Sequence, residues 1–173
     1  MRQLRYSVAS SLDGYIAGPK GEFDWIVIDP EIDFAVMYAS FSGIVMGRRS
    51  YEVTAAGGGA GEAGLPTYVY SRTLPEGERD GVTFARDAVA HVRALKAADG
   101  KPLWLWGGGD LFRQLAGAGL VDGVDVAIIP VLVGGGIPLL ATPGPRMPLR
   151  LRSHRLYAAT GTLALQYDVV REQ

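Results

Sequence analysis

The sequence of 173 residues contains no cysteine and only two histidines. The absence of cysteine excludes disulfide bonds, thiolate metal ligands and cysteine nucleophiles. Two histidines are too few for a histidine-rich metal centre, so we expect no metal site. A chain without cysteine fits a reducing compartment, and we therefore expect the protein to be cytoplasmic.

The sequence also lacks an excess of basic residues and a long apolar run. Its formal net charge is −1 and its pI is about 6.1, which argues against nucleic acid as a partner. No stretch reaches the roughly 20 apolar residues that would span a bilayer, and the N-terminus has no apolar signal segment, so we expect no membrane association. With 48% hydrophobic residues, the chain has the composition of one globular domain over residues 1–173.

Strand-like and helix-like segments alternate along the chain. Repeated strand, helix, strand units predict right-handed crossovers and a mainly parallel α/β sheet with helices on both faces. The glycine-rich segment 55–66 is expected to be a mobile surface loop. At the C-terminus, alternating apolar and polar residues predict an antiparallel hairpin. The expected strands are 3–10, 43–47, 67–71, 82–85, 103–106, a strand within 122–136 and the hairpin 149–158 with 161–170; the expected helices are 29–42, one or two turns after 47, 87–97 and 111–118.

Three consecutive glycines, Gly107 to Gly109, follow the apolar strand "LWLW" and precede a helix. In open α/β sheets ligands bind beyond the carboxyl ends of the strands, and a helix N-terminus attracts anions. The glycines therefore predict a site for a pyrophosphate. The usual dinucleotide fingerprint does not match, because Phe112 stands where it requires a third glycine, and no P-loop is present. A turn that only permits close packing remains the alternative.

Arginine and serine follow the two preceding strands. Arg48 and Arg49 come directly after strand 43–47, and Ser71 and Arg72 end the next one. Carboxyl ends of parallel strands share one edge of a sheet, so these residues are expected near the glycines. Arginine and serine favour a ribose 2′-phosphate, which indicates NADPH rather than NADH. The alternative is that each arginine is a solvated loop residue.

Five motifs in order, "ASSLDGYIAG", "IVMGRRSYE", "VYSRTLP", "LWLWGGGDLFRQL" and "PVLVGGGIPLL", resemble the dihydrofolate reductase superfamily. They are most similar to the branch that includes the C-terminal reductase domain of the riboflavin-biosynthesis deaminase-reductase. The resemblance implies a dihydrofolate-reductase-like three-layer fold and NADPH as hydride donor. It also implies cofactor-binding roles: beside the nicotinamide, Ala9 and Ile16; at the phosphates and adenosine ribose, Gly47, Arg48, Arg49, Ser50, Ser71 and Arg72; at the pyrophosphate, Gly107, Gly108, Gly109, Asp110 and Leu111.

Two departures from the family pattern bear on the substrate. Tyr15 stands where the riboflavin branch commonly carries lysine, so we do not expect the ribosyl-phosphate pyrimidine to be the substrate. Neither Glu31 nor Asp33 aligns with the acid that holds a pterin in dihydrofolate reductases, so folate reduction is not expected either. Hydride transfer requires mainly positioning and exclusion of water.

A proton must still reach the reduced product, and the candidates for supplying it are Asp33, Asp24 and Tyr15. The alternatives are that Asp33 is an exposed acid that serves a helix dipole and that Asp24 caps a turn. The sequence thus predicts an NADPH-dependent reductase of a small heterocyclic or carbonyl-bearing acceptor. A nucleotide-binding protein without turnover and a structural subunit are the alternatives. We expect a homodimer, formed through edge strands or the hairpin, as the family resemblance also implies.

Overall fold

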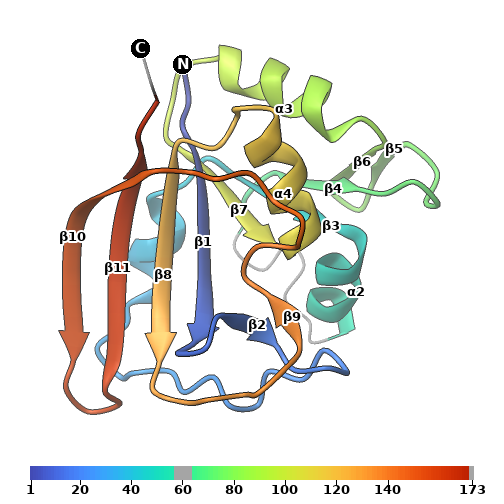
Figure 1. Cartoon of the computed structure of the whole chain (residues 1–173). Helices are drawn as coiled ribbons and strands as arrows, with labels where there is room; N and C mark the ends of the chain where they lie inside the picture. Colours follow the sequence, from blue (N-terminus) through green and yellow to red (C-terminus); the bar gives the residue numbers. More distant parts are fainter. Residues whose placement is uncertain (57–63, 172–173) are drawn as a thin grey trace.

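The computed structural model describes residues 1–56 and 64–171, and within these residues the chain is built around a nine-stranded sheet (Figure 1). The strand order is β10-β11-β8-β1-β7-β3-β4-β6-β5, and a separate small sheet pairs β2 with β9. The strands are β1 Leu4–Ser11, β2 Tyr15–Ala17, β3 Gly43–Gly47, β4 Thr67–Tyr70, β5 Gly77–Arg79, β6 Val82–Ala85, β7 Leu103–Gly107, β8 Gly123–Ile129, β9 Ile137–Pro138, β10 Leu149–Tyr157 and β11 Thr162–Val169.

The central strands β8, β1, β7, β3, β4 and β6 pair in parallel, while β5, β11 and β10 join through antiparallel pairs. Their short apolar runs, such as "GIVMG" and "LWLWG", are buried on both faces, as expected of parallel strands. The predicted mainly parallel sheet and the C-terminal antiparallel hairpin are confirmed.

Helices cover both faces of the sheet. Helices α3 (Ala88–Ala97) and α4 (Gly109–Gly117) bury Val92 and Leu115 in one apolar cluster. Helices α1 (Phe34–Ala39) and α2 (Arg48–Ala56) supply Tyr38 and Tyr51 to a second cluster on the other face. The ring of Tyr6 on β1 stacks on Phe112 of α4, with centroids 4.0 Å apart, which fixes α4 against the sheet.

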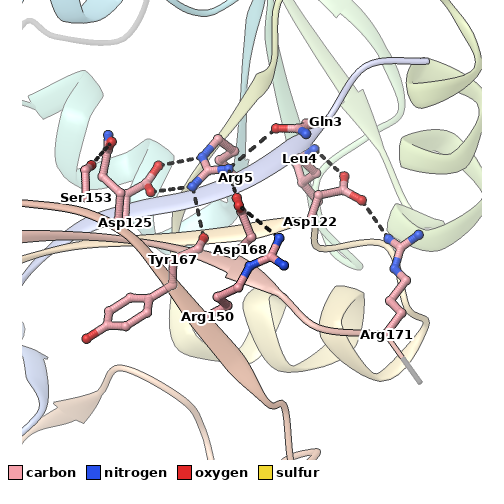
Figure 2. Close-up of polar contacts among 11 residues, drawn as sticks. Gln3, Leu4, Arg5, Asp122, Asp125, Arg150, Ser153, Tyr167, Asp168 and Arg171 are labelled. Carbon is pink, nitrogen blue, oxygen red and sulfur yellow. Dashed lines mark hydrogen bonds and ion pairs between the residues drawn. The ribbon is translucent and has the colours of Figure 1, made fainter. Parts of the chain in front are cut away.

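A buried ion network joins three strands at the side of the sheet that carries the hairpin (Figure 2). The guanidinium of Arg5 on β1 donates to both carboxylate oxygens of Asp125 on β8, at 2.9 and 2.7 Å. It also donates to Asp168 on β11 at 3.2 Å and to the carbonyl of Tyr167 at 3.0 Å. These carboxylates keep the buried Arg5 charged and raise its pKa. The network fixes the register of the antiparallel hairpin on the parallel sheet.

The first predicted helix, 29–42, was wrong at its start. Helix α1 begins only at Phe34, because the Asp33 carboxylate accepts from the backbone N–H of Val36 and caps the helix. Asp29 is buried, and its carboxylate accepts both from the local N–H of Glu31 at 3.0 Å and from the hydroxyl of Thr160 in the hairpin turn at 2.9 Å. A long-range contact therefore competes with local capping.

Other boundaries also differ from the sequence prediction. Strand β8 ends at Ile129, and the short strands β2, β5 and β9 were not predicted, because two or three residues carry little periodic signal. The predicted loop 55–66 starts later than expected, since α2 continues through Ala56. Residues 57–63 of that predicted loop lie outside the described residues.

Candidate cofactor and acceptor site

Three parallel strands end at one edge of the sheet. Gly47, the last residue of β3, lies opposite Tyr70 of β4, and Met46 lies opposite Gly107 of β7. A Cβ atom placed on Gly47 would lie 3.9 Å from both the Gly107 oxygen and the Gly108 nitrogen. The Ser50 hydroxyl oxygen, in the first turn of α2, would lie 3.7 Å from a Cβ on Gly107. We call these ends of β3, β4 and β7 the glycine edge.

Helix α4 begins at the glycine edge with free backbone donors. Its N-cap is Gly108, which has no side chain to accept a hydrogen bond. The first backbone bond into the helix comes from Phe112 to the Gly108 carbonyl. Among the described residues, no acceptor is found for the N–H groups of residues 109–111. With the positive end of the helix dipole, these donors form a site suited to an anion.

Side chains are excluded at the glycine edge for different reasons. Gly107 has φ +142°, a conformation that L-residues rarely adopt, and its peptide bond to Gly108 is cis. A Cβ on Gly109 would lie 2.6 Å from the Pro138 carbonyl oxygen, so β9 packs directly on the start of α4. At Gly47 and Gly108, in contrast, an added Cβ would have no neighbour closer than 3.9 Å. It would make ordinary van der Waals contact, so the lack of a side chain at these two positions does not relieve a clash.

The predicted polar residues at this edge have differing environments. Arg48 pairs with Glu52 at 2.7 Å within α2, whereas Arg49 and Arg72 are exposed. Ser71 is buried, and its hydroxyl oxygen accepts from the N–H groups of Thr73 at 3.1 Å and Leu74 at 3.0 Å. These hydrogen bonds stabilise the turn after β4 and thereby fix the backbone at Arg72.

The last two residues of the predicted pyrophosphate segment contribute differently. The Leu111 side chain packs into the core, so only its backbone N–H could make the predicted contact with a pyrophosphate. Asp110 is exposed and lies 3.6 Å from Arg113 one turn along α4.

The first loop, which contains the predicted nicotinamide contacts, is held by Asp13. Its carboxylate accepts from the Ser11 hydroxyl at 2.6 Å and from the N–H groups of Val133 at 3.1 Å and Gly134 at 2.8 Å. These hydrogen bonds lower the pKa of Asp13 to about 2. They join the first loop to the segment after β8. Interpreting "DG" in the sequence as a simple turn does not predict this contact. Ile16 lies in β2 beyond this contact, and Ala9 lies on β1 opposite Ala127.

An aromatic wall, which we did not predict from the sequence, lies beside the glycine edge. Trp106, the residue before Gly107, is half-buried and stacks on Trp104 with centroids 4.6 Å apart. Tyr38 of α1 and Phe41 also contact Trp104. The signal was present in "LWLW", because residues two apart on a strand share a face. Such a wall suits a flat ring.

The three candidate proton donors lie on separate segments. Tyr15 is half-buried in β2, where its N–H donates to the Ser11 hydroxyl oxygen. Asp24 is exposed in a turn, and Asp33 caps α1. No hydrogen bond joins these three residues to one another among the contacts of the described chain.

Comparison with known proteins places the fold. A family model described as "RibD C-terminal domain" matches residues 2–163. The chain is 29% identical to the protein YyaP of Bacillus subtilis (strain 168), over 96% of this chain and 94% of YyaP. A crystal structure from Shewanella sp. PV-4, named "Putative riboflavin biosynthesis protein", superposes with a TM-score of 0.82 at 23% identity, covering 99% of this chain and all of that one.

Dihydrofolate reductase from Enterococcus faecalis, in complex with NADP(H), superposes with a TM-score of 0.69 at 18% identity, over 98% of this chain and 97% of that one. The predicted dihydrofolate-reductase-like three-layer fold is confirmed. Separately, no helix within residues 1–56 and 64–171 is long and apolar enough to cross a membrane.

Proposed function

Because the chain belongs to the RibD C-terminal domain family, we propose that it is an NADPH-dependent oxidoreductase that transfers a hydride to a small heterocyclic acceptor. Family membership supports an oxidoreductase-type function. The observation that carries the finer proposal is the convergence at the glycine edge. The side-chain-free ends of β3 and β7, the unpaired N–H groups of α4 and the arginines after β3 and β4 all lie on one edge of the sheet.

The residues present fit such a cofactor. A cofactor could approach the backbone at Gly47 and Gly108, where a Cβ would stand in the way, and the α4 donors beside them suit a pyrophosphate. Arg72, exposed two residues after β4, carries no ion pair within the described chain, and we assign it to a ribose 2′-phosphate. NADPH, when bound, supplies the hydride.

The chain's own part in the reaction is positioning. The Asp13 contacts hold Ile16 and Tyr15 in a fixed loop, and Trp106 offers a flat apolar surface next to the glycine edge. Together they would hold a planar acceptor and exclude water. Because Tyr15 lies in this fixed loop, we assign it first among the three candidates as the proton source. Asp24 and Asp33, which are exposed, remain the other two candidates.

Two measurements test the proposal. The melting temperature should rise with NADPH more than with NADH, and NADPH absorbance should fall when a panel of heterocyclic and carbonyl acceptors is added. Arg72→Ala should weaken NADPH much more than NADH, whereas Arg152→Ala, which removes the same charge from β10, should leave both unchanged. Equal losses for the two cofactors would contradict 2′-phosphate recognition by Arg72.

The alternative is a nucleotide-binding protein without turnover. It predicts the same stabilisation by NADPH but no oxidation with any acceptor. Failure of NADPH to raise the melting temperature at all would favour the third reading, a structural subunit.

A further inference from the structure

A cavity of about 440 Å³ lies at the end of the sheet opposite the glycine edge. It is formed where residues before β1 meet the ends of α3 and α4 and the segment after β11. Figure 1 shows both chain ends at this side of the molecule. The five residues of β7, whose first residue Leu103 lies opposite Leu4, separate it from the glycine edge by about 15 Å, at 3.3 Å per residue. It is therefore separate from the proposed cofactor site.

Cations outnumber anions in the lining of this cavity. Arg2, Arg93, Lys96 and Arg171 all line it, against the single carboxylate of Asp122. The Asp122 oxygens accept from Lys96. Figure 2 shows that they also accept from Arg171, at 2.6 Å, and from the N–H of Leu4, at 2.7 Å. Asp122 pairs with both Lys96 and Arg171, and its one negative charge leaves three positive charges among these side chains; we call this cavity the cationic pocket.

Helix C-termini attract cations, and this effect accounts for two of the four cationic side chains, Lys96 and Arg171. Lys96 donates to the Leu120 carbonyl, and Arg171 donates to the Gly119 carbonyl at 3.2 Å. Both carbonyls belong to the turn after α4, where a positive charge is favourable. Arg2 and Arg93 make no side-chain hydrogen bond or ion pair to any described residue. Moreover, the Arg2 Nε atom is buried and lacks a partner among the described residues.

We propose that the cationic pocket binds a phosphate group, either as inorganic phosphate or as the monoester of a small metabolite. A phosphate monoester carries nearly two negative charges at neutral pH, and Arg2 and Arg93 are the two cations of the lining that have no carboxylate partner among the described residues. Guanidinium groups donate in pairs to phosphate oxygens, and the terminal N–H groups of Arg2 and Arg93 would be the donors here. The buried Lys96 adds a positive charge that its position on α3 fixes in place.

The test measures the melting temperature against inorganic phosphate, glycerol 3-phosphate and glycerol, with potassium chloride keeping the ionic strength constant. Either phosphate compound should raise the melting temperature saturably, whereas glycerol should not. The larger shift identifies free phosphate or a monoester as the better ligand. The double variant Arg2→Gln, Arg93→Gln should abolish the shift, since neither side chain has a partner whose loss would unfold the chain.

Two control variants distinguish the cationic pocket from other sites. Arg152→Gln removes a charge from the distant β10 and should keep the full shift. Arg72→Gln alters the proposed cofactor site and should also keep it. The proposal is overturned if neither phosphate compound stabilises the protein beyond potassium chloride, or if the shift survives in the double variant or disappears in Arg72→Gln. None of these results depends on whether NADPH binds.

Discussion

Replacing Gly47 by alanine tests the glycine edge with one methyl group. A Cβ at this position would meet nothing closer than 3.9 Å, an ordinary van der Waals distance, so the folded chain can accept it. Alanine also costs less conformational entropy than glycine within a strand, which should stabilise the fold by about 0.5–1 kcal/mol. We therefore expect Gly47→Ala to melt at the same temperature as the unsubstituted protein or higher.

Cofactor binding should change in the opposite direction. A phosphate oxygen that accepts from the Gly108 N–H would lie about 2.9 Å from that nitrogen. The new methyl would lie 3.9 Å from the same nitrogen and compete for the space above it. Losing one hydrogen bond to a charged group costs about 1.5–3 kcal/mol, so the NADPH dissociation constant should rise roughly 10- to 150-fold. Titration calorimetry or cofactor fluorescence measures this change.

The matched control is Gly117→Ala, at the other end of α4. Gly117 is exposed and has no atom within 4 Å of a new Cβ. Alanine in this helical position should stabilise the fold by about 0.5–1 kcal/mol and leave NADPH binding unchanged. If Gly47→Ala is stable yet binds NADPH as tightly as the unsubstituted protein, the pyrophosphate does not lie at the glycine edge.

Three further predictions concern the rest of the molecule. Asp13→Asn should lower the melting temperature at neutral pH. Folding depresses the pKa of Asp13 to about 2, so the stabilisation from its carboxylate is present above the unfolded pKa of about 4 and is lost as the pH falls towards 2. The difference in melting temperature between variant and parent should therefore shrink on acidification, and a constant difference would contradict this. Asp125→Ala should cost about 3–5 kcal/mol in urea unfolding, because buried Arg5 loses its bidentate partner, and an unchanged midpoint would refute this. We also propose a homodimer, because β10 exposes apolar side chains, Leu151 and Leu156 among them. Light scattering should give a dimer mass for the parent and a monomer mass for Leu156→Glu. A monomeric parent would disprove the proposal.

The sequence predicted the sheet well because the buried parallel strands are short, purely apolar runs bounded by turns. "GIVMG" and "LWLWG" can be buried on both faces, and the helix after Gly109 has a clear apolar stripe. The start of the first helix was not predictable in the same way. Asp29 has a better local capping sequence than Asp33, and one of its oxygens does accept from the Glu31 N–H, but the other accepts from Thr160, 131 residues away, and the helix starts only after Asp33. Only tertiary structure decides such a competition.

The candidate site was predictable where backbone conformation requires glycine and not where distant segments meet. Gly107 and its neighbours could be identified from their position between a strand and a helix. The contact between Asp13 and the Gly134 N–H, in contrast, has no local signature. The cationic pocket is likewise assembled from Arg2, Arg93 and Arg171, which are spread over almost the entire chain, so no motif marks it.

The position of Pro138 links the two halves of the proposed site. It is the register partner of Tyr15 in the small sheet, and its carbonyl oxygen lies where Gly109 leaves no room for a side chain. A ligand that displaces Tyr15 would therefore, through Pro138, also displace the first turn of α4. If the proposed function is correct, binding of the acceptor and binding of the dinucleotide would therefore be coupled, and each ligand would alter the affinity for the other by the same factor.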